Sequence, residues 1–281
     1  MIPCSPQIAQ IVATALAEDI GPGDLTTAAC IPPDQRAVGE FLAKQDGVQS
    51  GLYVVAEVFA QGGPDCRLQT LAQEGDAFCA GDILARVEGP TAQILRCERV
   101  ALNFLQRLCG IATLTRRYVQ AVEGTGARIT DTRKTTPGLR ILEKAAVRAG
   151  GGSNHRFALY DGVILKDNHI AACGGIRAAV ERARASVPHL VKIEVETTSL
   201  AQVEEALAAG ADVIMLDNMT PEQMAQAVAL IAGRAVVEAS GGVRLETVTE
   251  VARTGVDLIS VGKLTHSAPA VDISLELHAS V

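Results

Sequence analysis

The sequence predicts an α/β protein in which an irregular N-terminal half precedes a regular C-terminal half of alternating strands and helices. Hydrophobic residues make up 48% of the 281 residues but aromatic residues only 3%, and tryptophan is absent. A core of Ala, Val, Leu and Ile suits helices packed on buried parallel strands. Polar residues at predicted strand ends recur at spacings of 21, 23 and 22 residues, from Glu196 to Asp217, Ser240 and Gly262. One short βα unit has this length, so the succession predicts a (βα) barrel.

The N-terminal half, up to about residue 110, shows no regular repeat. Apolar patterns predict helices over residues 7–17, 53–61 and 91–108, and strands over residues 37–43, 66–72 and 83–88. A Gly-Pro-Gly segment predicts a loop over residues 18–27. Gly110 is expected to interrupt the long helix before a second helix that ends at residue 121. This half is therefore expected to be α+β in character.

The C-terminal half follows a strand, loop and helix rhythm from residue 127 onward. Strands are expected over residues 127–131, 162–166, 190–196, 212–217, 235–240 and 257–261, with helices over residues 199–209, 221–232 and 245–253. Thr220 is a predicted N-cap, and Gly210 and Gly255 fall just beyond two helix ends. An open doubly wound sheet is the alternative, and the absence of a Gly-x-Gly-x-x-Gly motif after the first strand disfavours it.

Charge and cysteine content exclude several classes of protein. The net charge of -7 argues against a nucleic acid or an anionic membrane as the partner. No segment approaches the ~20 continuous apolar residues of a transmembrane helix, and residues 1–7 lack the pattern of a signal peptide. The seven cysteines form no Cys-x-x-Cys pair, which favours reduced thiols over disulfides or a zinc site. We therefore expect a cytoplasmic protein with neither a nucleic-acid nor a membrane partner.

A cationic segment spans residues 128–166, with eight Lys or Arg residues against three acids. In a barrel the site lies at the carboxyl ends of the strands, and four of these cations flank such ends: Arg133, Lys134, Arg156 and Lys166. Guanidinium and ammonium groups bind carboxylates and phosphates. The segment therefore predicts a site for a small, multiply anionic substrate. His155, in a glycine-rich loop, is expected to belong to the same site.

Three further cations of this segment are expected to lie outside the site. Arg140, Lys144 and Arg148 recur every four residues. This spacing predicts one solvated helix face, with Glu143 as a local partner.

Two carboxylates, Glu196 and Asp217, end successive apolar strands and need a partner there. With a substrate phosphate they suit Mg²⁺. The alternatives are hydrogen bonds to ribose hydroxyls or a structural ion pair with Lys166 or Lys192. Glu194, two residues before Glu196, points to the same face and is a further candidate.

Glycine-rich turns follow the last predicted strands, at Ser240-Gly241-Gly242 and at Gly262. Glycine lets backbone N–H groups approach phosphate oxygens, and the next helix adds the dipole of its N-terminus. These turns therefore predict a phosphate-binding site.

Eight motifs are distributed along nearly the whole chain: DIGPGDLT (19–26), ERVALNFL (98–105), TRKTTPGLR (132–140), GGGSNHR (150–156), LKDNHI (165–170), LDN (216–218), EASGG (238–242) and VGKLTHS (261–267). Taken together, they resemble the quinolinate phosphoribosyltransferase family, also called the carboxylating nicotinate-nucleotide pyrophosphorylases, and they occur in the family's order. This set is far more specific than any one motif.

The resemblance implies a fold and a reaction. The fold would be an N-terminal open-faced α/β sandwich domain (residues 1–110) and a C-terminal partial (βα) barrel (residues 111–268), with the tail 269–281 a candidate to pack on the first domain. The reaction would transfer phosphoribose from 5-phosphoribosyl 1-diphosphate to quinolinate, with Mg²⁺, and release CO₂ and diphosphate to give nicotinate mononucleotide. The enzyme would be a homodimer, or a higher oligomer, with shared active sites.

The resemblance also implies roles for individual residues. The implied catalytic residues are Lys134, Glu196 and Asp217, of which Glu196 and Asp217 would hold the metal and the ribose hydroxyls. The implied quinolinate ligands are Arg133, His155, Arg156, Lys166 and, from the partner subunit, Arg99. The implied ligands of the 5-phosphate are Ser240, Gly241, Gly242 and Gly262.

Three other functions compete with this interpretation. A phosphoribosyltransferase-like protein of the molybdate-transport type would share the barrel but usually lacks the full Asn-His-Arg and Lys-Asp-Asn-His motifs. A biotinyl or lipoyl carrier would need a lysine in the hairpin near Gly81, and no lysine lies between Lys44 and Lys134. A Schiff-base lyase would use Lys166 and leave the surrounding arginines unexplained.

Overall fold

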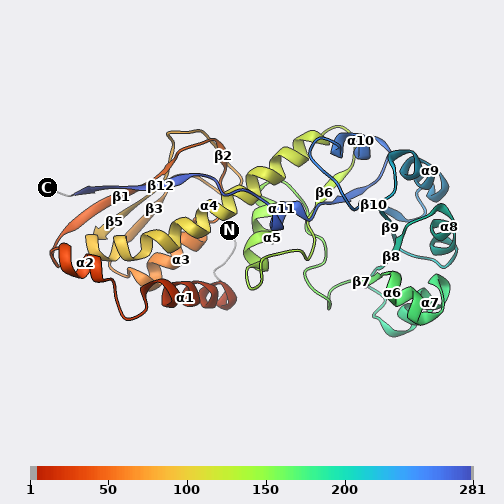
Figure 1. The fold of residues 1–281 in the computed structure, drawn as a ribbon, viewed down its shortest axis with the longest axis horizontal. Helices are drawn as coiled ribbons and strands as arrows, with labels where there is room; N and C mark the ends of the chain where they lie inside the picture. The colour runs from red at the N-terminus through yellow and green to blue at the C-terminus, as the bar shows by residue number, and fades with distance from the viewer. Residues whose placement is uncertain (1–4, 280–281) are drawn as a thin grey trace. The chain divides into compact units, whose positions relative to one another are not determined.

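A computed structural model describes residues 5–279, which form two compact units (Figure 1). The first unit contains the chain up to Arg116, the segment Thr135–Gly151 and the chain from Thr265; the second contains Arg117–Lys134 and Gly152–Leu264. The domain ranges expected from the sequence, 1–110 and 111–268, stay a prediction. Within the described residues, no helix is both long enough and apolar enough to cross a membrane.

The first unit is built on a four-stranded antiparallel sheet. Its strand order is β12 (Ile273–Ala279), β1 (Arg36–Ala43), β5 (Ile83–Pro90) and β3 (Arg67–Thr70). Alternate residues of β1 are buried, because a strand turns successive side chains to opposite faces. Phe41 on the buried face meets Phe59 of α3 (Leu52–Gly62) edge to face, with ring centroids 6.3 Å apart. Helices α1 (Pro6–Ile20), α3 and α4 (Thr91–Ala121) run along this sheet (Figure 1).

The predicted loop over residues 18–27 is mostly wrong. Helix α1 continues to Ile20, and a short helix, α2 (Leu25–Cys30), begins soon afterwards. The reason is local, since the Asp24 carboxylate accepts a hydrogen bond from the Thr27 backbone N–H and caps α2. A two-stranded pair, β2 (Gly47–Val48) with β4 (Ala77–Phe78), was also not predicted.

The predicted break at Gly110 is wrong, because α4 runs without interruption for 31 residues. A Cβ atom on Gly110 would lie 2.0 Å from the carbonyl oxygen of Pro269. Glycine is therefore required here for the close approach of another chain segment, which a side chain would block. A single glycine costs a helix only about 1 kcal/mol, and packing along 31 residues easily offsets this cost.

The predicted solvated face of helix α5 (Arg140–Ala149) is wrong in part. Lys144 is buried and Arg140 is half-buried, while Arg148 is exposed. Glu143 is fully buried, and its partner is Arg107 of α4 rather than a cation on its own helix. Helical spacing identified the face, but only packing within the first unit determined that most of it is covered.

The second unit is a six-stranded parallel sheet, which matches the predicted alternation of strands and helices. The strand order is β6 (Arg128–Thr130), β11 (Leu258–Ser260), β10 (Val236–Ser240), β9 (Val213–Asp217), β8 (Ile193–Thr197) and β7 (Val163–Leu165). No ladder joins β6 to β7 among the residues described, so the barrel is partial. Because all six strands are parallel, their carboxyl ends meet at one edge, where the site is expected.

Helices connect successive strands on the outside of this curved sheet (Figure 1): α6 (Asp167–Cys173), α7 (Ile176–Ser186), α8 (Leu200–Ala208), α9 (Pro221–Ile231) and α10 (Val248–Arg253). Thr220 caps α9 as predicted, in a reciprocal capping box with Gln223. Gly210 and Gly255 have φ angles of 79° and 92° just beyond the ends of α8 and α10. These left-handed conformations end the helices without strain. A short helix, α11 (Lys263–His266), follows β11.

Candidate active site

A cavity of about 570 Å³ opens at the carboxyl ends of the parallel strands. Its walls come entirely from the second unit: Thr132, Arg133, Lys134, His155, Arg156, Ile164, Lys166, Glu196, Met215, Asp217, Asn218, Glu238, Ser240, Gly241, Gly242 and Ser260. Thus the fold brings together every predicted site residue except Arg99 and Gly262. Arg99 is exposed on α4 in the first unit, and Gly262 follows β11 without being among the lining residues.

The loop that carries His155 and Arg156 is held in place by Asp131, a buried residue at the end of β6. Its carboxylate accepts hydrogen bonds from the Asn154 side-chain amide (2.6 Å) and from the His155 backbone N–H (2.9 Å). Buried carboxylates need such donors. Asp131 therefore links the loop after β6 to the loop that carries His155 and Arg156, at the cavity wall that holds the cations.

Arg156, a cation of this wall, has a guanidinium whose hydrogen-bond donors are only partly used. Its Nη1 donates to the carbonyl of Gly162 (2.7 Å), but its Nε is buried and has no hydrogen-bond acceptor among residues 5–279. Burial lowers the pKa of Arg156, and the neighbouring charge of Arg133 lowers it further. A buried N–H without an acceptor is costly. The guanidinium therefore lacks a partner that an anionic substrate group at the cavity wall would supply.

Lys166 and Glu196 form an ion pair across the cavity wall, from the ends of β7 and β8. This is one of the alternatives that the sequence left open for Glu196. The carboxylate is mostly covered and the ammonium is about half exposed. The pair leaves the second oxygen of Glu196 and the remaining N–H groups of Lys166 for other partners.

The next two strands supply an acidic residue and a tight glycine turn. The Asn218 amide donates to the carboxylate of Asp217 (2.9 Å), and Asn218 itself has a positive φ of 54°. Gly241 has a φ of 91°, and a Cβ atom there would lie 2.4 Å from the side-chain oxygen of Asn218. The turn after β10 therefore requires glycine for two reasons, its backbone conformation and its contact with Asn218.

We expect the Gly241→Ala substitution to raise the KM for the phosphorylated substrate by about 5- to 100-fold, since a non-glycine residue in this conformation costs about 1–3 kcal/mol and would displace Asn218. Steady-state kinetics with each substrate varied would measure this effect. Gly210→Ala is a matched control, because its φ of 79° is similar but no atom lies within 4 Å of the added methyl group. Equal KM changes in both variants would contradict the role of the turn.

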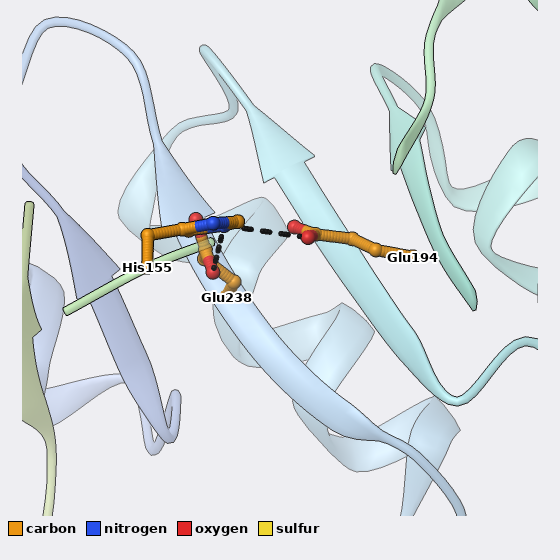
Figure 2. Close-up of side chains that lie close together, drawn as sticks. All are labelled: His155, Glu194 and Glu238. Atoms are coloured by element: carbon orange, nitrogen blue, oxygen red, sulfur yellow. Dashed lines mark ion pairs between the residues drawn. The ribbon is translucent and has the colours of Figure 1, made fainter. Parts of the chain in front are cut away.

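The Nε2 edge of the His155 ring faces two buried glutamates, Glu194 and Glu238 (Figure 2). Its Nε2 is 3.3 Å from a carboxylate oxygen of Glu194 and 3.4 Å from one of Glu238. Burial by itself lowers the pKa of His155, but the hydrogen bonds and charges of the two glutamates outweigh it and raise the pKa above its ordinary value. Burial raises the pKa of Glu194 in turn. The imidazole and the two carboxylates therefore form one cluster of interacting groups.

Several of these functional residues were not predicted from the sequence. Glu238 was missed, although it interrupts the apolar run of β10 as Glu196 interrupts that of β8. That interruption was the signal that could have found it. Asp131 and Asn218 stand at strand ends and were detectable in the same way. For Glu194 the sequence indicated the correct face of β8, but not its contact with His155.

The fold and the cavity together define a class of protein, an enzyme of the α/β barrel type. Its site at the carboxyl ends of the strands combines cations, carboxylates and a glycine turn, a set suited to a multiply anionic acceptor and a phosphorylated donor.

Comparisons with known proteins give the family. The profile of the quinolinate phosphoribosyl transferase N-terminal domain matches residues 24–109, and that of the C-terminal domain matches residues 111–276. The chain is 47% identical over 263 residues to a probable nicotinate-nucleotide pyrophosphorylase (carboxylating) of Bacillus subtilis, covering 94% of this chain and 91% of that protein. It is 43% identical to the chloroplastic enzyme of that name from Arabidopsis thaliana, covering 95% and 82%. The crystal structure of NadC from Streptococcus pyogenes superposes with a TM-score of 0.94 at 45% identity, covering 98% of both chains. The chain belongs to the quinolinate phosphoribosyl transferase family.

Proposed function

We propose that this protein transfers phosphoribose from 5-phosphoribosyl 1-diphosphate to quinolinate and decarboxylates the product, giving nicotinate mononucleotide, CO₂ and diphosphate. Relatives that are 41–47% identical over most of the chain carry the names of this decarboxylating enzyme. They favour this function over that of a molybdate-transport-type relative. The observation that carries the proposal is the set of three cations on the cavity wall, Arg133, Arg156 and Lys166, of which Arg156 donates one guanidinium hydrogen bond within the described residues and keeps other donors for a substrate carboxylate.

The geometry suits the two halves of the reaction. Arg133, Arg156 and Lys166 bind the two carboxylates of quinolinate and hold the ring nitrogen toward the donor, with Lys134 between the two substrates. As the ring nitrogen bonds to C1 of the ribose, diphosphate leaves and positive charge develops on the sugar. The carboxylates of Glu196 and Asp217 stabilise that charge.

Decarboxylation needs no nucleophile from the protein. The ring nitrogen is cationic once it is bonded to ribose. The electron pair released when the bond from C2 to the carboxylate breaks is stabilised by that cation, and C2 then takes up a proton. The residues of the wall only have to hold the second carboxylate and the ring in place.

The donor set at the ends of β8 and β9 fits the proposed Mg²⁺. Glu196, Asp217 and the side-chain oxygen of Asn218 are hard oxygen ligands at one edge of the cavity, and Mg²⁺ prefers a few such oxygens together with waters and phosphate oxygens. Glu196 and Asp217 would hold the ion, which would neutralise the leaving diphosphate. The backbone of Ser240, Gly241, Gly242 and Gly262 would hold the 5-phosphate.

One assay tests the function. Purified protein is given quinolinate, 5-phosphoribosyl 1-diphosphate and Mg²⁺, and both CO₂ and diphosphate are measured. Nicotinate serves as the control acceptor, and removal of Mg²⁺ with a chelator as the control for the metal. We expect equal amounts of both products with quinolinate and neither with nicotinate. No turnover of quinolinate would contradict the proposal.

We further propose a cytoplasmic homodimer in which Arg99 of one subunit completes the site of the other. Its support is that Arg99 is exposed and stands in the ERVALNFL motif, yet is not among the residues that line the cavity. Cys97 and Cys109 are buried thiols, which suit a reducing compartment.

Mixing two inactive variants tests the shared site. We expect Arg99→Ala and Lys134→Ala to be nearly inactive alone and to recover up to about a quarter of the activity when mixed, because random subunit exchange leaves one intact site in each mixed dimer. Activity is measured after exchange has been demonstrated with labelled subunits. No recovery in exchanged dimers would contradict the proposal.

A further inference from the structure

The two glutamates that face the Nε2 of His155 are buried charged residues. Glu194 is 6% exposed and Glu238 is 1% exposed. One oxygen of each faces the imidazole Nε2, and the other oxygen of each has no hydrogen-bond partner in the described part of the chain. Burying a carboxylate is costly unless a donor or a cation compensates for it. The imidazole is therefore the main compensation for both residues (Figure 2).

The other ring nitrogen shows which atom carries the proton. The backbone N–H of Arg156 donates to Nδ1 over 2.7 Å. A backbone N–H can only donate, so Nδ1 is an acceptor, and the ring proton lies on Nε2. This N–H points at Glu194 and Glu238. A divalent cation between the same three groups would need the lone pair of Nε2, which the proton occupies.

These contacts connect the two glutamates, through the His155 ring, to Arg156 at the cavity wall. The glutamates hold Nε2, and the opposite edge of the ring holds the backbone of Arg156. The His155 backbone is itself fixed by Asp131. The direction of the Arg156 side chain therefore depends on the position of the imidazole.

We propose that Glu194 and Glu238 are positioning residues for the quinolinate half of the site. They hold the His155 ring through its Nε2–H, and the ring in turn fixes the orientation of the Arg156 guanidinium. The kinetic effect expected from this proposal rests on the proposed function. The proposed contacts of the His155 ring with the two glutamates and with Arg156 do not. Both ring nitrogens have partners within the protein, so the imidazole is held from both edges.

Kinetics with conservative and disruptive variants test the consequence. We expect Glu238→Ala to raise the KM for quinolinate by about 5- to 100-fold, the loss that an unmade buried hydrogen bond produces, with the KM for 5-phosphoribosyl 1-diphosphate changed less than about twofold. Glu238→Gln keeps an acceptor oxygen and should recover most of the effect. Glu204→Ala, an exposed change on α8, is the matched control. Equal changes in both KM values, or no recovery with glutamine, would overturn the proposal.

A measurement without substrate separates this inference from the proposed function. Nitrogen NMR of protein labelled in histidine, assigned with His155→Gln, reports the protonation of each ring nitrogen at pH 7.5. We expect a protonated Nε2 in the wild-type protein and a lower protonation of Nε2 in the Glu194→Gln/Glu238→Ala variant. An unprotonated Nε2 in the wild-type protein, or Mn²⁺ or Zn²⁺ bound by the wild-type cluster but not by that variant, would overturn the proposal even if the assay shows turnover.

Discussion

The Arg156→Ala substitution is expected to lower kcat/KM for quinolinate by about 100-fold or more. Each hydrogen bond to a charged group contributes about 1.5–3 kcal/mol, and a guanidinium makes two to one carboxylate. Arg156 lines the cavity, and among the described residues its guanidinium donates one hydrogen bond, from Nη1 to the Gly162 carbonyl, so further donors remain for a carboxylate. Steady-state kinetics with both substrates varied would show that the loss lies in the kcat/KM for quinolinate.

Two further variants sharpen this test. Arg156→Lys keeps the charge but not the planar fork, so its activity should fall between those of the wild type and Arg156→Ala. Arg182→Ala removes an exposed arginine from α7 and should leave both KM values unchanged. A loss confined to the KM for 5-phosphoribosyl 1-diphosphate would show that Arg156 serves the donor instead.

The Glu143→Ala substitution is expected to lower the free energy of unfolding by about 3 kcal/mol, because removing one partner of a buried ion pair leaves the other uncompensated. Glu143 is fully buried and accepts from the Arg107 Nε at 2.9 Å and from the Thr136 backbone N–H at 3.1 Å. Arg107 also donates to the Thr136 hydroxyl and to the Thr265 carbonyl. The pair thus joins α4, α5, the loop at Thr136 and the backbone of α11 at Thr265.

Urea unfolding followed by circular dichroism measures this loss. Arg148→Ala, an exposed change on the same helix, should stay within about 0.5 kcal/mol of the wild type. The double variant Arg107→Ala/Glu143→Ala should lose less than the sum of the two single variants, because no unpaired charge remains. Additive losses would show that the two side chains do not stabilise one another.

The sequence by itself determined the features that depend on near neighbours and on strand periodicity. Thr220 caps its helix and Gly210 ends another because capping involves residues only a few positions apart. The strand ends were predicted because parallel strands recur at a regular spacing. Since parallel strands finish at one edge, the sequence alone predicts that Glu196, Asp217 and Ser240 share a site, and all three line the cavity.

Only the tertiary structure decided the features whose partners lie far away in the chain. Gly110 stands inside a helix rather than at its end, and glycine is needed there because the backbone of Pro269 passes too close for a side chain. Lys144 and Glu143 are buried because their helix packs within the first unit. Glu194 and Glu238 come from different strands and meet at one imidazole that neither strand carries. No periodicity encodes these contacts, because each depends on how separate segments pack and on which buried charge must find a partner.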